Sequence, residues 1–243
     1  MAITQQDIRD IIVNLIGGIL VAGLIYFISW LKKLIRTRRL KKLFGESIIL
    51  DEYYMVYGEM KPHEPKKPVY EVEGLQSKYW TPSVVSATTM KAIGIISQTI
   101  SRFRKPYISI EADKQLKNKF AISYCAIGGN NNLTHRILNS KHNRFFKFEK
   151  GGLVYSISED KHYSLYDNKD LGFIIKIMPD FLDSHVYIAV AGLGVWGTIG
   201  AAWYLSYKWK DIVRFAKSNE FGILVETEFG SYEKTKLISQ FKA

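Results

Sequence analysis

Two glycine-rich turns are the parts of this sequence with the clearest chemical potential, and each follows an apolar run that predicts a strand. The first turn and the helix predicted after it contain Gly128, Gly129, Asn130, Asn131 and Thr134. Glycine permits a positive φ, and asparagine side chains both donate and accept hydrogen bonds. Because the N–H groups at a helix start attract anions, this turn predicts a phosphate or carboxylate site. The alternative is a plain tight turn with a helix cap.

The second turn has the spacing G-x-G-x-x-G between a predicted strand and a predicted helix. Its residues are Gly192, Gly194 and Gly197, followed by Thr198. This context matches the dinucleotide fingerprint, which also has an acidic residue about 20 residues further on. Here the acid of the next predicted strand, Glu226, comes later, and Trp196 is bulky beside a pyrophosphate. The turn therefore predicts a phosphate or nucleotide contact, with Thr198 as a hydroxyl donor, rather than a complete NAD site.

Ligands of open α/β sheets bind at the carboxyl ends of the strands, so both turns are expected at one sheet edge, where they could form one pocket. Carboxylates also stand near strand ends, at Glu111, Asp113, Glu226 and Glu228. They could bind ribose hydroxyls, and Glu111, Glu226 or Glu228 could be the acid of a glycosidic-bond hydrolase. The alternative is that each is a solvated charge.

Other catalytic patterns are missing from the sequence. The five histidines show no metal-ligand spacing, and neither a G-x-S-x-G elbow nor a Walker A lysine motif occurs. A single cysteine, Cys125, excludes an internal disulfide and fits a reducing compartment. We therefore predict no metal and no certain cofactor, and the sequence leaves enzymatic activity open.

The order of elements predicts an α/β fold in which a Rossmann-like, doubly wound and mainly parallel sheet is covered on both faces. Strands are expected at 47–58, 107–111, 120–127, 172–177, 186–191 and 222–228, and helices at 83–103 and 196–217. A small antiparallel insert is expected at about 143–168, and a proline-rich loop at 59–82. The domain should cover 47–230, with 231–243 as a tail or short helix.

The stretch 11–31 is apolar, uncharged and long enough to cross a hydrocarbon core of about 30 Å as a helix. Residues 1–31 therefore form the anchor, and a basic helix or linker follows at 32–46, where the cations nearest the span are Lys32, Lys33, Arg36, Arg38 and Arg39. Because basic flanks stay cytoplasmic, we expect a single-pass protein of the inner or plasma membrane. Its amino terminus would be outside and its domain cytoplasmic.

The predicted span also suggests contacts with lipid and with a second copy. Gly18 and Ala22 have the small-xxx-small spacing that lets helices approach closely, and Asn14 could hydrogen-bond across such a contact. The basic flank could bind anionic headgroups or serve only as a stop signal. A second span at 186–207 is a less favoured alternative, since its glycines suit a turn and its basic flank would be carried outside.

At the two turns the chain resembles the SLOG-type Rossmannoids, a nucleotide-sensing superfamily that includes LOG-like and DNA-processing-protein-like domains. The resemblance rests on strand–Gly128-Gly129-Asn130–helix and strand–Gly192-x-Gly194-x-x-Gly197-Thr198–helix. It implies a similar fold over about 47–230. For a membrane-tethered member it also implies an effector of bacterial antiviral signalling that senses a nucleotide-derived messenger. The LOG hydrolases carry P-G-G-x-G-T-x-x-E, and no matching glutamate follows Gly129, so the resemblance implies sensing more than catalysis.

The net charge of +11 is concentrated after the predicted span, and the remaining domain is only mildly basic, so no specific nucleic-acid partner is expected. The leading hypothesis is a membrane-anchored sensor that binds a small phosphorylated ligand derived from a nucleotide and forms a homo-oligomer. A nucleotide or NAD glycosidic-bond hydrolase and a ligand-free membrane scaffold are the alternatives.

Overall fold

The computed structural model describes residues 5–46, 48, 52–59, 85–101, 107–116, 123–149, 153–179 and 185–243. These residues fall into two units that divide between Arg39 and Leu40. The proline-rich loop predicted at 59–82 lies outside the described residues from position 60 onward.

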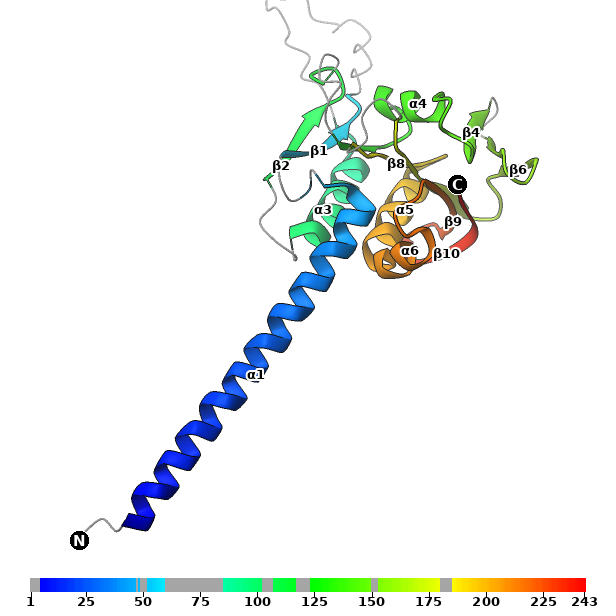
Figure 1. The fold of residues 1–243 in the computed structure, drawn as a ribbon. Helices are drawn as coiled ribbons and strands as arrows, with labels where there is room; N and C mark the ends of the chain where they lie inside the picture. The colour runs from blue at the N-terminus through cyan, green and yellow to red at the C-terminus, as the bar shows by residue number, and fades with distance from the viewer. Residues whose placement is uncertain are drawn as a thin grey trace, which may run out of the picture. The chain divides into compact units, whose positions relative to one another are not determined.

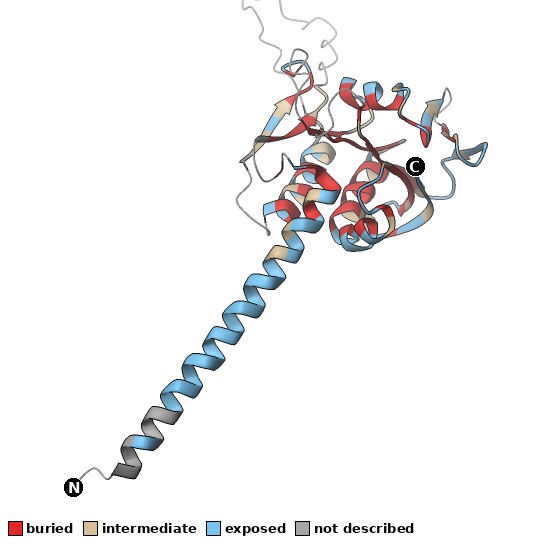
Figure 2. Ribbon diagram, viewed as in Figure 1, coloured by how far each residue is buried: buried red, intermediate tan, exposed pale blue. Residues whose placement is uncertain are grey.

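The first unit consists of most of helix α1, which runs from Gln5 to Phe44. Side chains from Asn14 to Lys33 are exposed, among them Leu20 at 68% and Leu24 at 59% (Figure 2). Within the described residues, α1 is the one helix with the length and the apolar composition to span a membrane, and its most apolar 18-residue stretch has a mean hydropathy of 1.9. The basic residues predicted as a helix or linker continue α1 without a break as far as Phe44.

The second unit contains a seven-stranded sheet in the order β10-β9-β7-β8-β3-β1-β2 (Figure 1). Its first half is parallel and comprises β1 (Glu52–Tyr57), β2 (Tyr107–Ala112), β3 (Tyr124–Ile127) and β8 (Tyr187–Gly192). Its second half is antiparallel and comprises β7 (Lys169–Ile177), β9 (Phe221–Glu228) and β10 (Ser231–Lys242). The sheet is therefore mixed, whereas a mainly parallel sheet was predicted.

Strand β10 replaces the tail or short helix predicted at 231–243, so that prediction was wrong. Phe229 and Gly230 connect β9 to β10, and Gly230 has a φ of +80°. A two-residue connection can join only antiparallel neighbours. Lysines at 234, 236 and 242 lie on this edge strand, where charged side chains discourage pairing with another chain.

Helices cover one face of the sheet, and a helix with a second small sheet covers the other (Figure 1). On the first face are α3 (Ala87–Ser101), α5 (Val195–Tyr207) and α6 (Trp209–Ala216). On the second are α4 (Asn132–Leu138) and the antiparallel sheet β4-β5-β6 (Phe146–Glu149, Leu153–Ser156, Lys161–Ser164). The small antiparallel insert that was predicted is thus present.

The apolar run 186–207 folds as strand β8, the second glycine turn and helix α5. It is not one uninterrupted helix, so the alternative of a second span is not what the structure contains. The single helix predicted at 196–217 is also divided, because α5 ends and α6 begins at Lys208.

A buried lysine connects the end of α1 to the sheet. Lys176 on β7 is 1% exposed, and its Nζ donates hydrogen bonds to the Lys42 carbonyl at 2.6 Å and the Ser218 carbonyl at 3.1 Å. The last carbonyls of a helix have no partner within the helix and carry partial negative charge, so a cation is favourable there. Burial lowers the pKa of Lys176 to about 8, and the nearby Glu220 carboxylate partly opposes this.

This lowered pKa predicts a rise in stability with pH. The ordinary lysine pKa of 10.5 applies to the unfolded chain, so between about pH 8 and 10.5 the unfolded chain binds more protons than the folded one. As the pH rises through this window, the free energy of unfolding of the native chain should therefore increase by up to about 3 kcal/mol more than that of Lys176→Met. Denaturant unfolding of the full chain in detergent at each pH measures it. The exposed-site variant Lys236→Met should keep the native pH dependence, and an identical pH dependence in Lys176→Met would contradict the prediction.

Candidate functional site

The two glycine turns lie side by side at one edge of the sheet. Strands β3 and β8 are parallel neighbours with Ile127 opposite Val190, so the two turns leave the sheet at the same end. Gly128 donates its N–H to the Val190 carbonyl at 2.9 Å. A Cβ on Gly129 would lie only 3.3 Å from the Gly192 carbonyl oxygen. The two turns are therefore neighbours at one edge of the sheet, as the sequence predicted.

A cavity of about 420 Å³ opens between the turns, which is within the usual range for small-molecule sites. The first turn of α3 forms one wall, through Ser86, Thr88 and Thr89. Strand β4 forms another through Phe148 and Glu149, and α4 contributes His135. The remaining lining residues are Gly58, Ile127, Gly128, Gly129, Asn130, Asn131, Gly192, Leu193, Gly194, Val195 and Thr198.

Some of the binding residues predicted in and after the first turn hold the fold together, and others line the cavity. Gly128 has a φ of +96°, a conformation that favours glycine. Asn131 is fully buried; its Nδ2 donates to the Val56 carbonyl at 2.6 Å, and its Oδ1 accepts from Leu133 N–H at 2.8 Å. Asn131 therefore holds the turn against β1 and caps α4. Asn130 is exposed and lines the cavity, so its side-chain amide is the one of the two that could contact a ligand. Thr134, also predicted as a binding residue, is buried and is not part of the lining.

A carboxylate already occupies the start of α4. Asp113 is 3% exposed, and its Oδ2 accepts a hydrogen bond from Asn132 N–H at 2.9 Å. The sequence suggested Asp113 as a partner for ribose hydroxyls, but in the structure it holds the helix that follows the first turn. Its charge also makes this helix start a poor place for a phosphate.

A second buried carboxylate occupies the G-x-G-x-x-G turn. Asp170 on β7 is 1% exposed, and it accepts hydrogen bonds from Gly194 N–H at 3.0 Å and Gly197 N–H at 2.7 Å. Burial raises the pKa of Asp170, and hydrogen bonds from these backbone N–H groups act against that rise. A phosphate at this turn would have to displace Asp170. The Thr198 hydroxyl, predicted as a donor to phosphate, donates instead to the Gly194 carbonyl at 3.3 Å.

Close packing of α5 on the sheet explains most of the glycine spacing in this motif. A Cβ on Gly197 would overlap the Leu171 carbonyl, and a Cβ on Gly172 would overlap the Gly197 carbonyl. A Cβ on Gly192 would approach Thr198 N to 2.5 Å, and one on Gly200 would overlap the Thr227 hydroxyl. The glycines therefore let α5 lie directly on β7 and β9, whatever the cavity binds.

The cavity lining includes side chains that sequence reasoning missed. Thr88 and Thr89 lie inside the helix predicted at 83–103, and only the structure, in which α3 begins at Ala87, places them in its first turn. Phe148 and Glu149 gave no local signal, since the small sheet must first fold over the large one. The Glu149 Oε2 and His162 Nε2 atoms lie 2.7 Å apart, within hydrogen-bond distance. The ring centroids of Phe148 and His135 are 6.3 Å apart.

The glutamates proposed for hydrolysis are not at the cavity. Glu111 accepts a hydrogen bond from the Ser109 hydroxyl at 3.0 Å on β2. Glu226 pairs with Lys169 at 2.7 Å and also accepts from the Tyr166 hydroxyl. Glu228 pairs with Lys234 at 3.4 Å. None of the three lines the cavity, so the structure does not bring them to one reaction site.

No group of three or more His, Cys, Asp or Glu side chains in the described part of the chain is arranged to hold a metal ion. Comparison with models of known protein families gives no match, and comparison with curated proteins gives no match either.

The packing of α5 makes Gly197→Ala a sharp test of this description. Its methyl group would collide with rigid backbone at Leu171, so we expect a loss of about 1–3 kcal/mol or more in the free energy of unfolding. Gly94→Ala on α3 is the matched control, because a Cβ there meets nothing within 4 Å. That control should be neutral or stabilising by up to about 1 kcal/mol. Urea unfolding of the full chain in detergent measures both, and equal effects would refute the packing argument.

Proposed function

We propose that this protein is a membrane-anchored sensor whose α/β domain binds a small phosphorylated ligand derived from a nucleotide. One observation carries the proposal: the two glycine turns and the first turn of α3 enclose a single cavity at the carboxyl ends of parallel strands. Sheet edges of this kind bind ligands in many α/β proteins. The SLOG resemblance at the same two turns supports the same class of ligand.

The first turn of α3 is the best place in this cavity for the phosphate. Asp113 and Asp170 hold the starts of α4 and α5, whereas among the described residues no carboxylate is hydrogen-bonded to the first turn of α3. The first N–H groups of a helix lack intrahelical partners, and they favour an anion. The hydroxyls of Ser86, Thr88 and Thr89 add donors at the same place.

The opposite wall suits the rest of a nucleotide. Phe148 offers an aromatic face, and the neighbouring His135 ring could flank a base. Aromatic side chains stack with any base, because every base has a π face. Glu149 is the carboxylate of the lining and could accept hydrogen bonds from ribose hydroxyls. Thr88 and Glu149 would then mark the two ends of the ligand.

The charge of the cavity limits how many phosphates it accepts. Among the described residues, its lining contains neither lysine nor arginine, and Glu149 adds a negative charge. A triphosphate or pyrophosphate needs several cations or a metal ion to offset its charge. We therefore propose a ligand with one phosphate, as a monoester or as a cyclic diester.

The membrane part of the proposal rests on α1. The apolar stretch at 11–31 would cross the bilayer, with the amino terminus outside and the domain in the cytoplasm, because the basic flank follows the span. Gly18 has nothing within 4 Å of an added Cβ, so its surface is open to a second copy. Leu40, Leu43 and Phe44 at the other end of α1 are buried in the domain core. Ligand binding would then alter self-association of the anchors.

Hydrolysis is the weaker candidate, since Glu111, Glu226 and Glu228 lie elsewhere. A ligand-free scaffold is the other alternative, and the polar lining of the cavity argues against it.

Ligand binding is tested on the full chain in detergent with a panel of nucleoside monophosphates and cyclic mono- and dinucleotides. A ligand at a hundred times its Kd should raise the free energy of unfolding by about 2.7 kcal/mol. Thr88→Val with Thr89→Val removes two hydroxyls at nearly constant shape and should weaken binding at least tenfold. Thr99→Val at the far end of α3, whose hydroxyl bonds the Ile95 carbonyl, should bind normally. No stabilisation by any ligand of the panel would count against the sensor.

Orientation is tested in cells that express the chain with a different tag at each end. Protease added outside intact cells should remove the amino-terminal tag and leave the carboxy-terminal tag until the membrane is opened. Replacing Lys32, Lys33, Arg36, Arg38 and Arg39 with Gln should weaken this preference, because the charge bias sets orientation. Cleavage of the carboxy-terminal tag in intact cells that express the native chain would overturn the proposed topology.

A further inference from the structure

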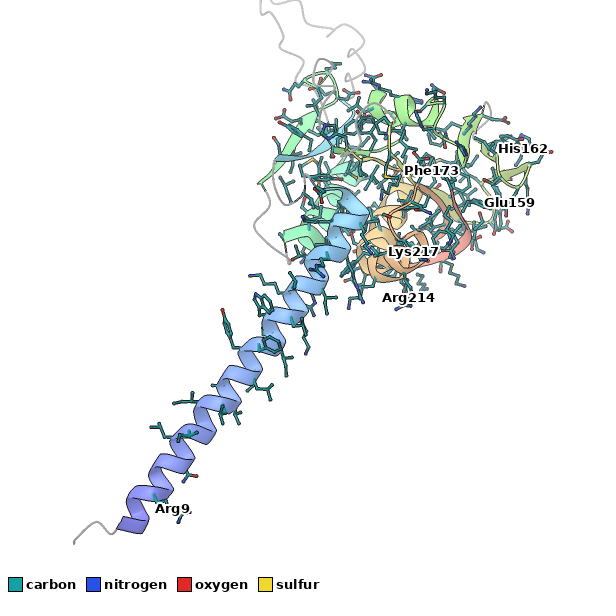
Figure 3. All side chains as sticks on the ribbon, viewed as in Figure 1. Arg9, Glu159, His162, Phe173, Arg214 and Lys217 are labelled. Atoms are coloured by element: carbon teal, nitrogen blue, oxygen red, sulfur yellow. The ribbon has the colours of Figure 1, made fainter. Side chains whose placement is uncertain are left out.

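One exposed surface of the domain gathers cations around α6. We define the α6 basic face as Lys208, Lys210, Arg214 and Lys217, all of which are exposed. Arg214 lies at the outer edge of the domain, with Lys217 at the end of the same helix (Figure 3). Asp211 is the acid of this helix, and it pairs with Arg214 at 3.2 Å. The three lysines have no ion pair within the described residues, so the face carries excess positive charge.

The α6 basic face adjoins the end of helix α1. Lys176 Nζ bonds both the Lys42 carbonyl near the end of α1 and the Ser218 carbonyl just after α6, at 2.6 and 3.1 Å. Leu40, Leu43 and Phe44 belong to the same large hydrophobic cluster as Trp209, Ile212 and Val213 of α6, a cluster that also includes residues of α3, α5 and the sheet. Exposed Lys42 therefore extends the same cationic surface.

Aromatic side chains accompany these cations. Tyr207 is 64% exposed, and its ring stacks on Trp203 at 4.8 Å between centroids. Lys210 Nζ lies 5.9 Å from the centroid of the Trp209 ring, which is itself buried at 5% exposed. An exposed tyrosine beside lysines, as Tyr207 is here, is typical of surfaces that lie at the boundary between membrane and water.

The length of the helix limits how far Lys42, which adjoins the α6 basic face, can be from a bilayer. At 1.5 Å per residue, Lys42 lies at most about 16 Å along the helix from residue 31, where the proposed span ends. The headgroup layer takes up about 5–8 Å of that distance. The remaining distance is close to the Debye length of about 8 Å at physiological salt, so anionic headgroups attract cations at this position.

We propose that the α6 basic face binds anionic phospholipid headgroups of the bilayer that α1 enters, and so holds the domain against the membrane surface. This inference rests on the membrane anchorage in the proposed function and is independent of ligand binding. It assigns a lipid role to Lys208, Lys210, Arg214 and Lys217, which lie far along the chain from the basic flank of the span.

The test uses the full chain in nanodiscs of phosphatidylcholine alone or with 30% phosphatidylglycerol, and it measures amine acetylation of each lysine by mass spectrometry. Phosphatidylglycerol should slow acetylation of Lys208, Lys210 and Lys217 at least threefold, and high salt should reverse the effect. Lys234 and Lys236 serve as internal controls because both lie on β10, where Lys236 is opposite Glu226, near the end of β9, whereas α6 precedes the start of β9 at Phe221. Equal rates in both lipids, or equal slowing at the controls, would overturn the proposal.

Matched variants separate a specific face from general attraction. In Lys210→Gln with Lys217→Gln, the protection of Lys208 should fall by at least half, whereas Lys234→Gln with Lys236→Gln should leave it unchanged. Undiminished protection in the first variant would also overturn the proposal. Retention of the chain in the nanodisc after alkaline carbonate is scored separately, and loss of the chain at that step would mean that the anchorage itself has failed.

Discussion

The carboxylate of Asp170 organises the edge of the sheet on which the cavity depends. It accepts backbone hydrogen bonds from Gly194 and Gly197 while it is almost fully buried. A buried carboxylate is tolerated only where hydrogen bonds replace its lost water, and the start of α5 provides them. These hydrogen bonds also fix the residue at which α5 begins. The glycines let that helix lie directly on β7 and β9. The second turn is thus held in place without any ligand.

This internal capping changes which part of the cavity can receive an anion. At two of the helix starts around it an aspartate accepts backbone hydrogen bonds, and the lining residues that the structure describes include no lysine or arginine. The first turn of α3, with its three hydroxyls, is left as the favourable electrostatic position. This supports our proposal of a small ligand with one phosphate, held between hydroxyls on one side and an aromatic ring on the other.

From Leu40 onward, the end of α1 belongs to the same compact unit as the rest of the domain. Lys176 reaches from the sheet to the α1 carbonyl at Lys42, and α6 packs in the same cluster as the last turn of α1. The buried amine therefore joins the last turn of α1 to the segment just after α6 through two backbone carbonyls. The same arrangement brings the α6 basic face beside Lys42.

By itself, the sequence determined the local features: the apolar stretch 11–31, the strand–turn–helix pattern around each glycine turn, and an α/β fold with a small antiparallel insert. These follow from periodicity and from residue types over short distances. Only the tertiary structure decided that half of the sheet is antiparallel and that the chain ends in strand β10. It also decided that the three candidate glutamates lie away from the cavity and that Asp113 and Asp170 accept hydrogen bonds at two helix starts. Asp170 lies 24 residues before Gly194 in the chain, and nothing local marks it as the partner of that turn. Contacts of this kind exist only after β7 and β8 have paired, because pairing of the strands is what places the carboxylate under the helix.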